Sequence, residues 1–317
     1  MTSYGRGVNA LRSLLSGGPA AIDGGLASEL EARGHDLTGT LWSARLLRDD
    51  PAAIRDVHTA YFRSGATVGI SASYQASRSG FLVHGFDADE ADTLVALSVA
   101  LVREAREDAA AAGAVHPMLV AASVGPYGAT LHDGSEYRGR YGVSHEFLVG
   151  FHRERIEVLA AASPDLLAIE TVPDLDEAFA IAEALQGCDR PAWLSFSCAD
   201  GARTCAGQPI EDAAAFVAAT PALDAIGINC TKPEHVAGLV ARIRAAAPDL
   251  PIVVYPNAGR IWDGVASQWH SAGIDALPDA AVQAWFDSGV SLVGGCCGLG
   301  PSVVSSVAAV AASARPR

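Results

Sequence analysis

Three cysteines are the residues of this sequence with the clearest chemistry. Cys296 and Cys297 stand between glycines in a GGCCG run, and Cys230 ends the apolar stretch 225–229. Thiolates suit Zn²⁺, and a tetrahedral ion with three protein ligands keeps a fourth position for water or substrate. Two adjacent cysteines reach one ion only where the backbone turns sharply, which glycine permits. The pattern predicts a catalytic zinc site on Cys230, Cys296 and Cys297.

The adjacent pair has a second interpretation as small buried residues, because free cysteine is among the most buried residue types. Cys230, at a second apparent strand end, favours metal binding, and Cys198, after the probable strand 192–197, is a competing ligand. Six cysteines in 317 residues are too few for a disulfide scaffold. After loss of metal, we expect Cys296 and Cys297 to be able to form a disulfide.

The elements that must position these cysteines alternate along the chain. Eight short β-rich runs are each followed by a turn signal and a longer segment with helical spacing. The runs are 20–23, 68–73, 118–124, 166–170, 192–197, 225–229, 251–255 and 290–294, and helix candidates include 51–64, 87–112, 145–162, 174–185, 233–246 and 279–287. Eight such units predict an α/β fold, a single-domain (β/α)₈ (TIM) barrel over 1–317 with a short N-terminal extension of about 1–18. A doubly wound sheet is disfavoured, because the glycines after Asp23 lack the dinucleotide-binding spacing.

In a barrel, the residues that follow the strands gather at one mouth. Strands six and eight alternate around the barrel, and strand eight closes against strand one, which brings Asp23 beside the cysteine pair. The expected mouth residues are Asp23, Ser71, Tyr74, Glu170, Cys230, Tyr255, Asn257, Cys296 and Cys297. Two insertions, 34–48 and 125–144, emerge on the same face. The second is rich in glycine and aromatic residues, which is typical of a substrate lid.

Composition excludes several classes of partner. The chain carries 22 basic and 36 acidic residues, a net charge of −14, and its only lysine is Lys232. Nucleic acid and anionic membrane are therefore not expected partners. The sequence shows neither a secretory leader nor an apolar run long enough to cross a membrane. We expect a cytoplasmic protein.

Taken together, the motifs resemble those of the homocysteine S-methyltransferases, most closely the small bacterial and plant type that uses S-methylmethionine. The matching stretches run through nearly the whole chain in family order: DGGLASELE (23–31), LWSA (41–44), SASYQAS (71–77), SVGPYG (123–128), DGSEYRG (133–139), ET (170–171), GINC (227–230), VYPN (254–257) and GGCCG (294–298). The resemblance implies a (β/α)₈ barrel, zinc on the three cysteines, and conversion of homocysteine to methionine.

The resemblance also suggests roles for the remaining mouth residues. Zinc would hold the homocysteine sulfur as a nucleophilic thiolate, and Asp23 and Glu170 would pair with its α-amino group. Asn257 or water would fill the open zinc position between substrates. The donor is a sulfonium, S-methylmethionine or S-adenosylmethionine, which aromatic faces attract. The expected aromatic contacts are Trp42, Tyr74, Tyr127 and Tyr141, and Ser71, Gln75 and Asn229 complete the expected pocket. The alternative for each aromatic residue is ordinary packing or lid structure, and for Asp23 and Glu170 it is a helix cap or a structural ion pair.

Two other functions compete with methyl transfer. A zinc hydrolase on the same barrel would bind hydroxide at the open position, although such sites favour histidine and carboxylate ligands. A non-catalytic thiol or metal-binding protein would need only the cysteines. Metal analysis, combined with an assay of methyl transfer to homocysteine, separates the three.

Overall fold

The computed structural model describes residues 9–37, 42–259, 261–263, 268–270 and 273–314, without the side chains of 42–44, 261–263 and 268–270. Eight parallel strands form one sheet in the order β1-β10-β7-β6-β5-β4-β3-β2. They are β1 (Ala20–Ala21), β2 (Val68–Ile70), β3 (Leu119–Val124), β4 (Leu166–Val172), β5 (Ala192–Phe196), β6 (Ala225–Asn229), β7 (Ile252–Tyr255) and β10 (Val290–Val293). Two backbone hydrogen bonds bring β1 to β2, from Thr67 N to Ala21 O and from Asp23 N to Val68 O. The sheet is therefore nearly closed into the predicted barrel.

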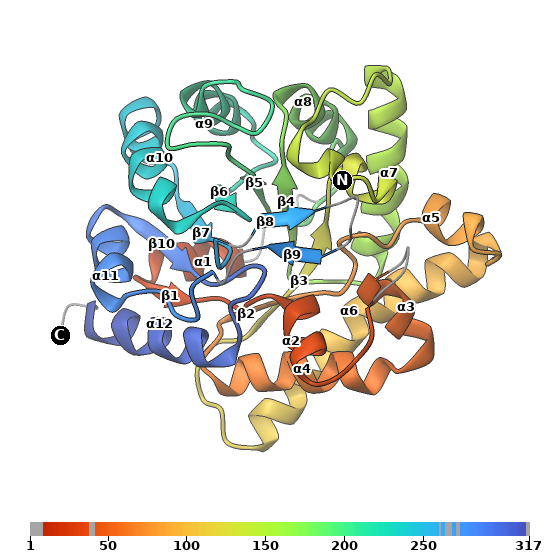
Figure 1. Ribbon diagram of the computed structural model, residues 1–317, viewed down its shortest axis with the longest axis horizontal. Coiled ribbons are helices and arrows are strands. Elements are labelled where there is room, and N and C mark those ends of the chain that lie inside the picture. Colours follow the sequence, from red (N-terminus) through yellow and green to blue (C-terminus); the bar gives the residue numbers. More distant parts are fainter. Residues whose placement is uncertain (1–8, 38–41, 260, 264–267, 271–272, 315–317) are drawn as a thin grey trace, which may run out of the picture.

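Helices surround the strands (Figure 1). They are α1 (Ala10–Ser16), α2 (Leu26–Ala32), α3 (Trp42–Asp49), α4 (Pro51–Arg63), α5 (Arg78–Val83), α6 (Ala88–Ala111), α7 (His145–Ala161), α8 (Leu175–Ala184), α9 (Ile210–Ala219), α10 (Pro233–Ala246), α11 (Asp279–Asp287) and α12 (Pro301–Ala314), with short 3₁₀ helices η1 (Tyr127–Leu131) and η2 (Ser135–Tyr137). Their starts follow the sequence signals. Asp50 caps α4 with Pro51 in its first turn, and Asp87 and Glu90 form a capping box on α6.

Side chains alternate along the strands between two apolar cores. In β5, Trp193 packs inside the barrel with residues such as Leu166 and Val253. Leu194 and Phe196 face outward into the larger core beneath the helices. Inside the barrel, the lower layers are apolar, and polar side chains follow at the carboxyl ends. This arrangement places reactive groups at the mouth on a rigid support.

Helix α1 lies within the expected N-terminal extension. Asn9 caps it by accepting a hydrogen bond from Arg12 N. Its Leu11 and Leu15 are buried with barrel-interior residues such as Ile22 and Leu292. The helix therefore closes part of the barrel interior with apolar side chains.

The observed strands agree with the predicted runs within a few residues at each end. Strand β10 pairs with β1 through Ala20↔Leu292, and β7 lies between β6 and β10, which confirms the predicted positions of the cysteine-bearing strands. An antiparallel hairpin of β8 (Ile261–Asp263) and β9 (Gln268–His270) follows β7 and was not among the predicted strands. In the described part of the chain, no helix combines the length and apolar character required to cross a bilayer.

Candidate active site

A cavity of about 130 Å³ lies at the carboxyl ends of the strands. It is lined by the β1–α2 segment, the ends of β2, β4 and β6, the 3₁₀ helix η2 and the GGCCG loop. Of the predicted site residues, eight line it: Asp23, Ser71, Tyr74, Gln75, Glu170, Cys230, Cys296 and Cys297. No lysine, arginine or histidine is among the described residues that line the cavity. The cavity is thus built to receive positive charge.

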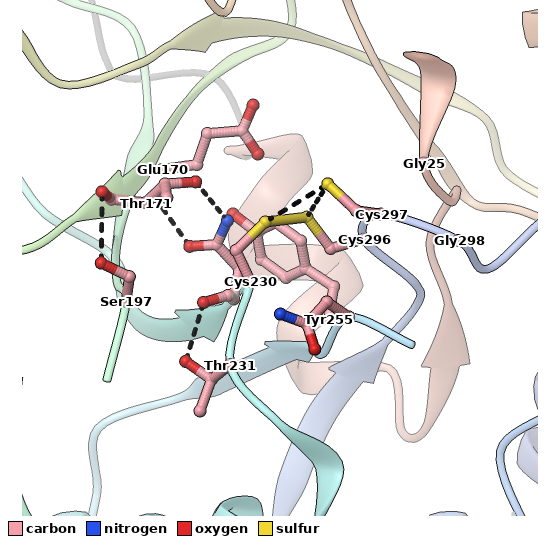
Figure 2. Close-up of a disulfide and its surroundings, with 12 residues drawn as sticks. Gly25, Glu170, Thr171, Ser197, Cys230, Thr231, Tyr255, Cys296, Cys297 and Gly298 are labelled. Carbon is pink, nitrogen blue, oxygen red and sulfur yellow. Dashed lines mark hydrogen bonds between the residues drawn. A yellow bond between two sulfur atoms is a disulfide. The ribbon is translucent and has the colours of Figure 1, made fainter. Parts of the chain in front are cut away.

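The three predicted cysteines converge in this cavity (Figure 2). Their sulfur atoms lie within 4.8 Å of one another, and they form the only such cluster of possible metal ligands among the described residues. Cys198, the competing ligand, is a buried free cysteine outside the cluster. Cys230 has a left-handed backbone, with φ of 45°. This conformation is uncommon for a side-chain-bearing residue and turns the chain where β6 ends.

Two of the three distances between the sulfur atoms fit a shared zinc ion. Cys297 Sγ is 3.8 Å from both Cys230 Sγ and Cys296 Sγ. Zn–S bonds of 2.3 Å in a tetrahedron place two sulfurs about 3.8 Å apart. Burial raises the pKa of the Cys297 thiol to about 12. A cation is therefore needed to stabilise its thiolate at neutral pH, and a divalent ion at this position would supply that charge.

Cys230 and Cys296 are joined by a disulfide, with their Cα atoms 5.6 Å apart. The expectation that the adjacent pair would form the disulfide is wrong, because Cys297 remains free. The barrel brings the ends of β6 and β10 to one point, so the partner of Cys296 comes from the other strand. This bond must be reduced before all three sulfurs can bind zinc.

Glycines allow the β1–α2 segment to pack directly on the cysteine loop. A Cβ atom on Gly25 would lie 2.6 Å from the Cys296 carbonyl oxygen, a distance that side-chain-bearing residues do not tolerate. Gly298 N donates to Ser28 Oγ at 2.9 Å. Tyr61 OH on α4 donates to the Gly25 carbonyl at 3.1 Å. These contacts fix the Cys296–Cys297 backbone against a second element.

Asp23 and Glu170 are two of the buried carboxyl groups that line the cavity. Asp23 accepts a hydrogen bond from Ile70 N at 2.6 Å, and Glu170 accepts one from Ser123 Oγ at 2.5 Å. Burial raises the pKa of Asp23 well above its ordinary value, with the charge of Glu170 as a further cause. Burial likewise raises the pKa of Glu170 to about 7. A bound cation would stabilise both as carboxylates.

Asn229 does not line the cavity. Its side chain is fully buried, and both ends of its amide bind Thr171: Thr171 N donates to Oδ1, and Nδ2 donates to Thr171 Oγ1, both at 2.7 Å. The expected substrate contact is replaced by a positioning contact. Thr171 lies next to Glu170, and Asn229 lies next to Cys230.

Tyr74 lies in the cavity lining as expected, in a loop held from behind by Arg155. The Arg155 guanidinium donates to the carbonyl oxygens of Ser73, Tyr74 and Gly125 at 2.8, 2.9 and 3.0 Å. Arg155 is 2% exposed, and this burial lowers its pKa to about 10. One buried cation thus joins the loops after β2 and β3.

Three other expected contacts lie outside the cavity lining. Tyr127 packs edge-to-face on Tyr141 and Phe147, and Tyr141 OH donates to Glu177 at 2.8 Å. Their rings belong to a separate apolar cluster with Leu148, so this placement does not support donor contact. The Oδ1 of Asn257 accepts from Gly259 N at 2.9 Å. The side chain of Trp42 is outside the described residues.

Glu136 and Tyr255 are further polar side chains of the lining. Tyr255 is part of the polar floor: its hydroxyl donates to Ser195 Oγ at 2.9 Å and accepts from Trp193 Nε1 at 3.2 Å. The sequence analysis placed Tyr255 at the mouth without a role and did not single out Glu136. The only available signal for Glu136 was its position in the DGSEYRG stretch.

Comparisons with known proteins agree with this geometry. Residues 20–311 match the family described as homocysteine S-methyltransferase. Homocysteine S-methyltransferase 4 of Zea mays is 45% identical, over 94% of this chain and 92% of its own. Crystal structures of the homocysteine methyltransferase MmuM from Escherichia coli are 40% identical and cover 95% of this chain and 99% of theirs. The TM-scores are 0.86 for the oxidized form and 0.83 for the metallated form.

Proposed function

Because the chain belongs to the homocysteine S-methyltransferase family, and so transfers a methyl group to homocysteine, we propose that zinc is its cofactor and S-methylmethionine its methyl donor. The observation that carries the proposal is the joint lining of one cavity by three convergent sulfurs and buried carboxyls, with no cationic side chain in the described lining. A hydrolase site would call for histidine or carboxylate ligands instead.

Cys230, Cys296 and Cys297 would hold the ion in their reduced form. When bound, zinc supplies a Lewis acid that lowers the pKa of a thiol and so favours the nucleophilic thiolate of homocysteine. The strand ends that carry the cysteines are braced by the β1–α2 segment. The sulfur of the acceptor would therefore meet a fixed position and not a mobile loop.

Asp23 and Glu170 would bind the α-ammonium group of homocysteine. Both side chains line the same cavity as the cysteines, and both are almost fully buried. The positive charge of a bound ammonium group would offset part of the free-energy cost of ionising two buried carboxyl groups. Two anchors, one at each end of a small substrate, fix the direction of its thiolate.

The reaction then needs no general acid. The homocysteine thiolate attacks the methyl carbon of the sulfonium, a new C–S bond forms, and the old methyl–sulfur bond breaks with its electron pair left on the donor sulfur. The leaving sulfide is neutral, and the thiol proton has already gone to solvent. Because no step requires a general acid, the reaction does not need a histidine, and none is found among the described residues that line the cavity.

The smaller donor is favoured by the match of the stretches SASYQAS (71–77) and DGSEYRG (133–139) to those of the S-methylmethionine-using type. Tyr74 and Gln75 of the first stretch and Glu136 and Tyr137 of the second line the cavity. The test is a donor comparison with reduced, zinc-loaded protein. We expect a higher kcat/KM for S-methylmethionine than for S-adenosylmethionine; the reverse order would reject the donor assignment.

A further inference from the structure

The carboxyl group of Glu136 is buried at the cavity, and one of its oxygen atoms has no hydrogen-bond partner among the described residues. Glu136 lies in η2, is 5% exposed, and lines the cavity. Its Oε2 is buried and has no hydrogen-bond partner among the described residues. A buried carboxyl oxygen without a hydrogen-bond partner is costly, and a bound ligand with a donor group would satisfy it.

The backbone around Glu136 is held by contacts that do not involve its Oε2 atom. Ser135 N donates to Asp133 Oδ1 at 2.9 Å, and Arg138 pairs with the same Asp133 at 3.2 Å. Ser197 Oγ donates to the Glu136 carbonyl at 3.4 Å. The turn is therefore fixed through its backbone and its exposed side, so the carboxyl is not required to hold it.

Three carboxyl groups line the cavity: Asp23, Glu136 and Glu170. The two substrates of the proposed reaction bring three positive charges, namely two α-ammonium groups and one sulfonium. Asp23 and Glu170 are assigned to the homocysteine ammonium. Glu136 then remains as a carboxyl for the donor, whose ammonium and sulfonium are both candidates.

We propose that Glu136 binds the α-ammonium group of the methyl donor and is the residue that selects an amino-acid sulfonium; this inference rests on the proposed function. The ammonium is favoured over the sulfonium by the chemistry of transfer. The sulfonium loses its charge as the methyl group leaves, so a carboxylate paired with it would stabilise the ground state over the transition state. The ammonium keeps its charge throughout. A contact to it strengthens donor binding without slowing the chemical step.

The test compares two donors in the reduced, zinc-loaded enzyme and in the variant Glu136→Gln. One donor is S-methylmethionine, and the other is 4-(dimethylsulfonio)butanoate, which is the same sulfonium without the α-amino group. Loss of a charge-assisted hydrogen bond should lower kcat/KM for S-methylmethionine about ten- to a hundredfold, mainly through KM. The kcat/KM for 4-(dimethylsulfonio)butanoate should change little. The wild-type preference for S-methylmethionine over the butanoate should therefore be largely lost in the variant. The KM for homocysteine should stay the same.

Glu170→Gln is the matched control, because it removes another buried carboxyl of the same cavity. It should leave the donor preference intact and raise the KM for homocysteine. Equal losses for both donors in Glu136→Gln, or an unchanged preference, would overturn the inference. If that variant fails to fold, Glu136→Asp keeps the charge on a side chain one methylene shorter, and it should weaken the preference only in part; full retention of the preference would also overturn the inference. Wild-type protein that transfers no methyl group from S-methylmethionine would instead refute the proposed function.

Discussion

The side-chain amide of Asn229 makes two hydrogen bonds of 2.7 Å with Thr171: its Oδ1 accepts from Thr171 N, and its Nδ2 donates to Thr171 Oγ1. Thr171 follows Glu170 in β4, and Asn229 precedes Cys230 at the end of β6. Thr171 and Cys230 both have left-handed backbones, with φ of 61° and 45°. Such a conformation is costly, above all for a β-branched residue. The Asn229–Thr171 pair thus joins the proposed ammonium anchor to a proposed zinc ligand.

Replacing Asn229 with alanine should damage both anchors together. The change leaves Thr171 N buried without its partner, at a cost of about 1–3 kcal/mol, and removes one partner of Thr171 Oγ1. We expect a lower kcat/KM, a higher KM for homocysteine and weaker zinc binding. Gln208→Ala is the control, since its amide binds Asp174 and Thr204 at 2.7 Å outside the cavity lining. Wild-type kinetics in Asn229→Ala would show that the pair has only a structural role.

The zinc content of the protein should depend on Cys230, Cys296 and Cys297 and not on Cys198. Cys230→Ser, Cys296→Ser and Cys297→Ser each remove one of three convergent ligands, so each should bind far less than the one zinc per chain expected of wild type. Cys198→Ser should keep full zinc, because that sulfur lies outside the cluster. Metal analysis of reduced, desalted protein measures this. A Cys230→Ser variant with full zinc would remove Cys230 from the site.

Oxidation of the metal-free protein should block zinc binding through the Cys230–Cys296 bond. Peptide mapping should link the segment containing Cys230 to the one containing Cys296, and should leave Cys297 open to alkylation. Reduction should restore zinc uptake and activity together. Alkylation of Cys296 with a disulfide on Cys297 would contradict this pairing.

Because its pKa is raised in the folded protein, Glu170 should lower the free energy of unfolding as the pH rises. Burial raises its pKa to about 7 from an ordinary value of 4.5, so between these values the unfolded chain has lost its proton and the folded protein has not. The native state is therefore progressively disfavoured from about pH 4.5 to pH 7, by on the order of 3 kcal/mol. Ser123 can still donate to a glutamine at this position.

Glu170→Gln should accordingly unfold at a higher urea concentration than wild type at pH 8, in zinc-free, substrate-free protein. The difference should shrink towards pH 5, where wild-type Glu170 is protonated in the folded state. A midpoint difference that does not depend on pH would mean that Glu170 keeps an ordinary pKa.

The fold was predictable because strand ends and helix caps are local signals. The run 225–229 matches β6, and the Asp50–Pro51 cap marks the start of α4. Parallel topology then converts separation along the chain into proximity, which brought Cys230 to Cys296 and Cys297. The β8–β9 hairpin was not anticipated, since no β-rich run was recognised between residues 255 and 290.

Individual contacts in the cavity were less predictable, because sequence does not reveal which way a loop side chain points. Tyr74 follows the end of β2, and Tyr127 begins η1 after β3. Tyr74 lines the cavity, whereas Tyr127 packs on Tyr141. Asn229 looked like a substrate ligand, but Thr171 satisfies its amide. Glu136 is buried at the cavity only because η2 packs there in the folded chain, which the local sequence does not indicate.

We propose that zinc on Cys230, Cys296 and Cys297 activates homocysteine for methylation by S-methylmethionine. The most direct test is methionine formation from S-methylmethionine and homocysteine, measured against zinc content as reduced, metal-free protein is titrated with Zn²⁺. We expect no turnover without metal, a linear rise to one zinc per chain, and no rise in Cys230→Ser. Full turnover by metal-free protein, or by Cys230→Ser without zinc, would contradict the claim.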